Sequence, residues 1–345
     1  RLFAFSSPNQ MLQKRIALET DPAWKAALAD LYVHPQETAS GTESRVEFLV
    51  FETPRQQELK VALGGGTTHE DAALVHTVNR QRSGDWFHLT NFAGSYSPSI
   101  NKIVQDDHGF LWFGTNSALI RYDGARGKQY NEGNVLPGRT VISLEKDRQG
   151  NIWAGTSNST RSGGAFGAGG LSRLHNETWT TFKTSDGLIQ SMVLAISQDS
   201  RDRIWVGTSG GVSRLDDQQW TMITPANGLA HNVVHAIYED HTGVIWFGTE
   251  QGVSRYDGYT WRTYTSADGL GSDNVYAITG DKAGDVWFGT ANGASRFDGR
   301  NFVTFRQTIG DSVRAFLESS NGDMWCATHN GAKWYNGQKW FTFTT

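Results

Sequence analysis

The apolar residues of the chain fall in short runs that recur at a regular distance. The clearest run is an aliphatic residue followed by Trp, a variable residue, Gly and Thr, as in LWFGT or IWVGT; it occurs six times and is weakened to MWCAT at the last. Its tryptophans lie 41, 52, 41, 41 and 38 residues apart, at Trp112, Trp153, Trp205, Trp246, Trp287 and Trp325. The pattern predicts a tandem repeat of about 41 residues.

Each repeat contains four short apolar runs. An aliphatic run precedes the Trp string, a run such as LIRYDG or VSRYDG follows it, and an aromatic segment such as WTTF or WRTY ends the unit. Such runs separated by turn residues predict β-strands, and four strands in about 40–45 residues are typical of a propeller blade. We therefore predict an all-β chain folded as a β-propeller, with the tryptophans packed between blades because one sheet alone cannot bury both its faces.

A polar turn precedes each Trp string. Six residues before the Trp stand Asp106, Asp147, Asp199, Asp240 and Asp281, with Ser319 in the last repeat. A Gly usually follows the Asp three residues later, so we interpret the pair as a tight turn capped by the Asp side chain, with Gly at positive φ. Because these turns are distributed around one rim, they do not predict a metal site.

The number of blades depends on the residues before the regular repeats. The six repeats occupy 98–345, but the segment 86–90 (WFHLT) also matches the fourth run of a repeat. It needs three partner strands, and the candidates are the runs 46–52, 58–63 and 73–79. We therefore predict that 45–90 is a degenerate blade and that 45–345 is a propeller of seven four-stranded blades. The alternative is a six-bladed ring with 1–85 as a separate small β domain.

Residues 1–44 have a different pattern. Apolar positions such as Leu12, Ile16, Trp24 and Leu28 are spaced as in one or two short helices within 8–31. The polar stretch 36–43 is interpreted as a linker. We predict an N-terminal helical segment and linker over 1–44.

Composition excludes several classes of function. The 31 Lys and Arg residues are balanced by 35 Asp and Glu residues, so neither a nucleic-acid groove nor an anionic membrane surface is expected. A single cysteine, Cys326, rules out an internal disulfide. No apolar run approaches a membrane span of about 20 residues, and no phosphate loop or Cys/His spacing indicates a cofactor or a metal. The G-x-S-x-G string at 207–211 lies in an ordinary repeat hairpin, so no catalytic residue is predicted.

The repeat loses its regularity at one position of the first run. Eleven residues before each Trp stand Asn101, Ile142, Leu194, His235, Tyr276 and Arg314. Polar exceptions in a regular pattern are where function is expected, and propeller ligands usually bind at the mouth of the central channel. The predicted ligand-binding residues are Asn101, Lys102, His231, His235, Asn274, Tyr276 and Arg314. Arg and Lys would hold a carboxylate or phosphate, and Tyr and Asn would hold sugar hydroxyls. The alternative is a water-filled channel with an irregular lining.

The lengthened repeat carries its extra residues at 157–169 (SNSTRSGGAFGAG), between the second and third runs. Two interpretations remain open: a mobile lid over the channel, or an insertion without function.

The repeat resembles that of a known family. The pattern V-x-x-I-x-x-D-x-x-G-x-[IL]-W-[FV]-G-T-x-x-G-[VL]-S-R-[YF]-D, clearest at 234–257 and 275–298, is similar to the two-component regulator propeller repeat. The resemblance covers about 86–345. It implies a seven-bladed propeller of the kind found in the periplasmic sensor regions of bacterial hybrid histidine kinases, where such propellers bind or relay a carbohydrate signal.

The resemblance implies a non-enzymatic, ligand-sensing propeller that is periplasmic or extracellular and binds a small polar or carbohydrate ligand at the channel mouth. One alternative is an interaction scaffold that docks a protein partner on its rim. The other is a propeller lyase or hydrolase, for which His231 and His235 are the candidate catalytic residues.

Overall fold

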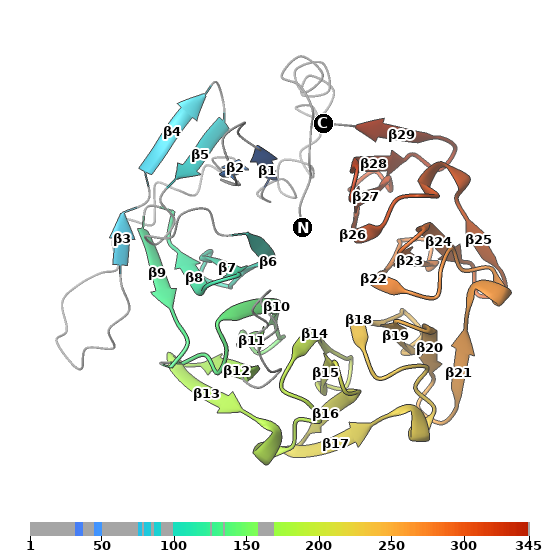
Figure 1. Ribbon diagram of the computed structural model, residues 1–345, viewed down its shortest axis with the longest axis horizontal. Coiled ribbons are helices and arrows are strands. Elements are labelled where there is room, and N and C mark those ends of the chain that lie inside the picture. The colour runs from blue at the N-terminus through green and yellow to red at the C-terminus, as the bar shows by residue number, and fades with distance from the viewer. Residues whose placement is uncertain are drawn as a thin grey trace.

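Six blades form most of the fold. The computed structural model describes residues 99–343, apart from 125, 134 and 158–168, and five short strands that precede them. Its blades are built from consecutive antiparallel strands, and the first strand of each blade lies nearest the centre of the ring while the fourth lies at the periphery (Figure 1). The prediction of an all-β propeller with four-stranded blades is confirmed.

Each blade is built on four consecutive strands of three to seven residues. Blades 1–3 comprise β6 (Ile100–Gln105), β7 (Leu111–Thr115), β8 (Leu119–Tyr122) and β9 (Arg126–Tyr130); β10 (Thr140–Lys146), β11 (Ile152–Ser157), β12 (Gly169–His175) and β13 (Thr178–Phe182); and β14 (Val193–Gln198), β15 (Ile204–Thr208), β16 (Val212–Asp216) and β17 (Gln219–Ile223). Blades 4–6 comprise β18 (Val234–Glu239), β19 (Ile245–Thr249), β20 (Gly252–Tyr256) and β21 (Trp261–Tyr264); β22 (Val275–Gly280), β23 (Val286–Thr290), β24 (Gly293–Phe297) and β25 (Phe302–Thr304); and β26 (Val313–Glu318), β27 (Met324–Thr328), β28 (Gly331–Tyr335) and β29 (Trp340–Phe343). One-turn 3-10 helices lead out of blades 2 to 5, at Thr184–Asp186, Pro225–Asn227, Ser266–Asp268 and Arg306–Thr308.

The strands before blade 1 pair differently from the prediction. β1 (Tyr32–Gln36) pairs with β2 (Arg45–Leu49), and β4 (Asn79–Ser83) pairs with β5 (Trp86–Thr90), so the described residues form two two-stranded sheets rather than one four-stranded sheet. These hairpins lie in the interval between blades 6 and 1 (Figure 1), and β2 lies beside β5. A seventh blade is therefore not confirmed, and 32–36, predicted as part of the helical segment and linker, is a strand. The predicted helices within 8–31 and the run 58–63 lie outside the described residues.

The run 73–79 was assigned to the wrong blade. Its residues Val75–Thr77 form β3, which pairs with β9 and adds a fifth strand to blade 1. The outer strand of a blade is a sheet edge with unpaired N–H and C=O groups, and β3 satisfies them along β9.

The tryptophans of the repeat form the contacts between blades. Five of them are at most 2% exposed, namely Trp112, Trp153, Trp205, Trp246 and Trp287. Trp246 meets Phe288 of the next blade edge-to-face at 5.4 Å, and Trp112 meets Trp179 at 6.2 Å. Edge-to-face aromatic pairs at these distances add to the stabilisation from burial, so the predicted role of the tryptophans is confirmed.

The Asp of each turn also holds the Trp. One oxygen of Asp199 accepts the backbone N–H groups of Arg201 and Arg203, both at 3.0 Å, as a capping Asp should. Its other oxygen accepts the indole N–H of Trp205 at 2.7 Å, and the same Asp–Trp bond measures 2.7–2.8 Å in blades 1, 2, 4 and 5. The predicted turn cap is thus confirmed, and the carboxylate additionally satisfies the polar atom of a buried side chain.

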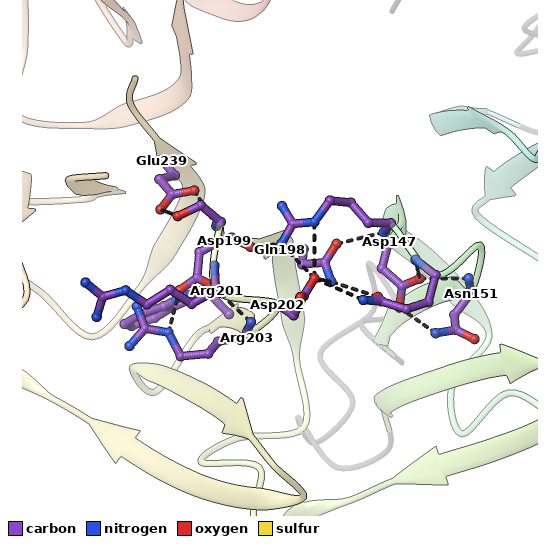
Figure 2. Close-up of polar contacts among 12 residues, drawn as sticks. Asp147, Asn151, Gln198, Asp199, Arg201, Asp202, Arg203 and Glu239 are labelled. Carbon is purple, nitrogen blue, oxygen red and sulfur yellow. Dashed lines mark hydrogen bonds and ion pairs between the residues drawn. The ribbon is translucent and has the colours of Figure 1, made fainter. Parts of the chain in front are cut away.

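The turns at this face are also joined between blades. Asp202 stands where most repeats have Gly and adopts a φ of 63°. Its carboxylate accepts hydrogen bonds from Nη2 of Arg148 at 2.8 Å and from Nε2 of Gln149 at 2.9 Å, which connects blade 2 with blade 3. Ser200 donates to Glu239 of blade 4 at 2.7 Å (Figure 2). The polar residues named here therefore link the turns of neighbouring blades.

Candidate functional site

The irregular position of the repeat is a β-bulge in the first strand of each blade. In blade 4, Val234 pairs with Thr249 and Ala236 pairs with Gly248, so His235 is the extra residue between two ladder pairs. The same register shift occurs in all six blades, at Asn101, Ile142, Leu194, His235, Tyr276 and Arg314. We call these six residues the bulge belt. A bulge re-aims the extra side chain away from the regular faces of the sheet, which explains why this position is free to vary.

Three members of the bulge belt touch each other. The rings of His235 and Tyr276 lie 5.4 Å apart between centroids, and the guanidinium carbon of Arg314 lies 3.6 Å from the centroid of the Tyr276 ring. These residues come from blades 4, 5 and 6. The contacts confirm that bulge residues of neighbouring blades converge, and the Arg–Tyr contact has the geometry of a cation–π interaction.

A carboxylate completes this cluster. Nε2 of His235 lies 3.5 Å from Oε1 of Glu250, and Nδ1 of His231 lies 4.0 Å from Oε2 of the same residue. Glu250 belongs to the turn between β19 and β20. We call His231, His235, Glu250, Tyr276 and Arg314 the His235 cluster. Glu250 was not predicted from the sequence, because the residue after the GT string varies among the blades.

The charge state of His235 follows from its surroundings. Burial lowers its pKa, and the positive charge of Arg314 lowers it further, whereas Glu250 raises it. The net shift is downward, so the imidazole is neutral at pH 7. A neutral imidazole can both donate and accept a hydrogen bond, which suits it to hydroxyl groups or to proton transfer.

Three polar atoms near the cluster are buried without a hydrogen-bond partner. They are Nε2 of His235, Oδ1 of Asn274 and Oγ of Ser312. The ion-pair distance from His235 to Glu250 is 3.5 Å, which leaves Nε2 without a well-formed hydrogen bond. Asn274 and Ser312 immediately precede the first strands of blades 5 and 6, so all three atoms belong to the same side of the ring. Buried polar atoms normally have partners, so each of these three atoms has unused hydrogen-bonding capacity.

Asn101 and Lys102 do not join the His235 cluster. The side-chain amide of Asn101 donates to Asn116 at 3.0 Å and to the backbone oxygen of Val141 at 2.9 Å. Lys102 interacts with Glu145 of blade 2; it retains solvent contact, but the surrounding protein lowers its pKa through desolvation. Desolvation likewise raises the pKa of Glu145 to about 7, which Lys102 opposes. The structure thus divides the seven predicted residues between two sides of the ring.

The remaining predictions concern a metal site, a membrane-spanning helix and the insertion at 157–169. Among the described residues no group of His, Cys, Asp or Glu has the geometry to hold a metal ion. Within the same part of the chain no helix is long and apolar enough to cross a membrane. Of the insertion 157–169, residues 158–168 lie outside the described residues, so neither interpretation of it is tested.

Comparison with known proteins agrees with the repeat pattern. Five segments match the sequence profile described as the two component regulator propeller, at 97–117, 135–158, 179–210, 228–251 and 269–292. The chain's repeats belong to the two component regulator propeller family. No curated protein matches the chain.

Several solved structures resemble this two component regulator propeller. The extracellular domain of the hybrid two component system BT3049 from B. thetaiotaomicron superimposes with a TM-score of 0.61 at 22% identity, over 79% of this chain and 36% of that one. Virginiamycin B lyase from Staphylococcus aureus, solved with quinupristin, gives 0.58 at 13% identity, over 79% and 88%. PorZ, a surface component of the type-IX secretion system of Porphyromonas gingivalis, gives 0.52 at 14% identity, over 89% and 45%. The chain spans about a third of the length of the BT3049 domain, and at these identities the similarity establishes the fold.

Proposed function

We propose that this chain is a non-enzymatic, ligand-binding propeller of the sensor type, located in the periplasm or outside the cell. Its site is the His235 cluster, and its ligand is a small polar molecule or a carbohydrate. The observation that carries the proposal is the set of three buried polar atoms without partners, on His235, Asn274 and Ser312, which all lie at the starts of the first strands of blades 4, 5 and 6. A bound hydroxyl-rich ligand would supply those hydrogen bonds, and each one left unmade in a buried place costs about 1–3 kcal/mol.

The family and the neighbours support the sensor role. The matched repeats are those of two component regulator propellers, and the BT3049 structure is an extracellular domain of a hybrid two component system. The cluster members His235, Tyr276 and Arg314 lie on the first strands of three blades, so a ligand there would bridge blades 4, 5 and 6. Binding of the ligand would then change the contacts between these blades. The relay of a signal to a neighbouring domain requires such a change.

The test is a thermal-shift screen followed by titration calorimetry. We expect one class among neutral sugars, acidic sugars and small carboxylates to raise the melting temperature of the wild-type chain. Tyr276→Ala and Arg314→Ala should then weaken binding about tenfold, because each loses a contact worth about 1.4 kcal/mol. Arg300→Ala is the matched control: this exposed arginine lies in the hairpin at the opposite end of blade 5. Unchanged affinity in both site variants would contradict the proposal, and a stable protein partner with no small-molecule response would favour the scaffold.

A second candidate function rests on the His235–Glu250 pair. A neutral imidazole 3.5 Å from a carboxylate can act as a general base, and a lyase from Staphylococcus aureus shares the propeller fold. If the chain is a lyase, His235→Ala abolishes turnover while the melting temperature is retained. If it is a binding module, His235→Ala changes affinity alone, and no product forms with any ligand that binds.

We also propose that the two N-terminal hairpins act as a degenerate seventh blade. They lie in the interval between blades 6 and 1, and β2 lies beside β5 (Figure 1). Hydrogen exchange on β2 and β5 should then be as slow as on β27 and β28. Exchange at the rate of an unfolded chain would contradict this role.

A further inference from the structure

The bulge belt changes character around the ring. Blades 4, 5 and 6 contribute His235, Tyr276 and Arg314, whereas blades 2 and 3 contribute Ile142 and Leu194. The first strands of blades 2, 3 and 4 are direct neighbours, β10 beside β14 and β14 beside β18. The aliphatic half of the belt is therefore continuous with the polar half, and Leu194 lies next in order to His235.

The aliphatic half is not part of the packing between blades. Val141 and Val193, which directly precede the two aliphatic bulge residues, are fully buried in the hydrophobic cores at 0% exposure. Ile142 and Leu194 belong to neither core and are partly exposed. These two aliphatic side chains, on the neighbouring first strands β10 and β14, therefore keep apolar atoms accessible from outside the cores.

The polar half offers a cation. Arg314 is exposed, and its contact in the structure is the face of Tyr276 at 3.6 Å. Within the described part of the chain no salt bridge joins it to a carboxylate, unlike Arg121, Arg148 or Arg203. A guanidinium held flat on an aromatic ring keeps its N–H donors available for a bidentate anion.

We propose that the ligand is an amphipathic anion: its carboxylate binds Arg314, its hydroxyls bind His235, Asn274 and Ser312, and an aromatic or alkyl group packs on Ile142 and Leu194. This assignment rests on the proposed function, since it specifies the chemical class for the same site. An aryl glycoside of an acidic sugar has all three parts. A free sugar lacks the apolar part, and a fatty acid lacks the hydroxyls.

Three probes separate these contributions by calorimetry: 4-nitrophenyl β-D-glucuronide, methyl β-D-glucuronide and 4-nitrophenyl β-D-glucoside. We expect the first to bind the wild-type chain most tightly. Replacing its aryl group by methyl, or its carboxylate by a hydroxymethyl group, should each weaken binding about tenfold or more.

The variants must act on one contribution each. In Leu194→Ser the aryl glucuronide should no longer bind more tightly than the methyl glucuronide, but it should still bind more tightly than the aryl glucoside. In Arg314→Gln it should no longer bind more tightly than the aryl glucoside, but it should still bind more tightly than the methyl glucuronide. Leu194→Ala is the second variant, should the serine variant fold poorly; it removes most of the apolar surface without adding a hydroxyl. Met222→Ala, at an exposed apolar residue of an outer strand, is the control and should change neither ratio.

The outcomes distinguish this inference from the proposed function. If both glucuronides bind equally, or if Leu194→Ser and Leu194→Ala both retain the aryl preference, the amphipathic assignment is wrong while ligand binding at the cluster stands. If no probe binds, the assignment is also wrong, and the sugar and carboxylate screen decides the proposed function separately.

Discussion

Replacing Asp199 by Asn changes one atom of the carboxylate and should destabilise the whole propeller. Asp199 is 1% exposed, and its two oxygens accept four hydrogen bonds, two from the backbone and two from the side chains of Arg203 and Trp205. An Asn in the same rotamer presents an N–H₂ group to one pair of these donors. Because Asn has nearly the shape of Asp, the substitution creates no cavity, and the change in stability reports the hydrogen bonds alone.

The magnitude follows from which donors can reach water. Arg203 can turn its guanidinium towards solvent, at the loss of a charge-assisted bond worth about 1.5–3 kcal/mol. Trp205 is 0% exposed, so its indole N–H would be left buried and unpaired at a cost of about 1–3 kcal/mol. We therefore expect D199N to lower the free energy of unfolding by about 3 kcal/mol.

Equilibrium unfolding in urea, followed by tryptophan fluorescence, measures this loss. Asp217→Asn is the matched control: it makes the same chemical change in the same blade at an exposed hairpin residue, whose φ of 44° Asn adopts as readily. The control should stay within about 0.5 kcal/mol of the wild type. If D199N is as stable as D217N, the bond between the turn and the Trp does not stabilise the blade, and our account of the repeated Asp is wrong.

Three other predictions concern single groups. Because burial raises the pKa of Glu145 from 4.5 to about 7, its protonation favours the folded state; stability should fall as the pH rises from about 4.5 to 7, and Glu145→Gln should flatten that part of the urea-midpoint profile. A Cβ at Gly280 would overlap the hydroxyl of Tyr238, so Gly280→Ala should cost about 1–3 kcal/mol, and adding Tyr238→Phe should restore part of it in a double-mutant cycle. Burial raises the pKa of the Cys326 thiol to about 12, so iodoacetamide should modify it only after unfolding, as mass spectrometry would show.

The ligand site was only partly predictable. The bulge position was visible as an irregular place in a regular repeat, and this was sufficient to find His235, Tyr276 and Arg314. Glu250 was not visible, because the residue after the GT string also varies from repeat to repeat. Its importance arises from its 3.5 Å distance to His235, which depends on how the turn of β19 folds over the first strand. Asn101 occupies the same repeat position, yet its partners Asn116 and Val141 engage it elsewhere.

The sequence by itself determined the strands, the repeat and the burial of its tryptophans. These features follow from periodicity within about 41 residues, and each repeat restates the same local information. Only the tertiary structure decided that β3 completes the edge of blade 1, that each Asp holds its Trp, and that three bulge residues of different blades meet around Tyr276. The physical reason is that a regular separation in the chain does not say which side chains meet: His235 and Tyr276 lie one repeat apart, but they touch only once the ring sets their blades side by side.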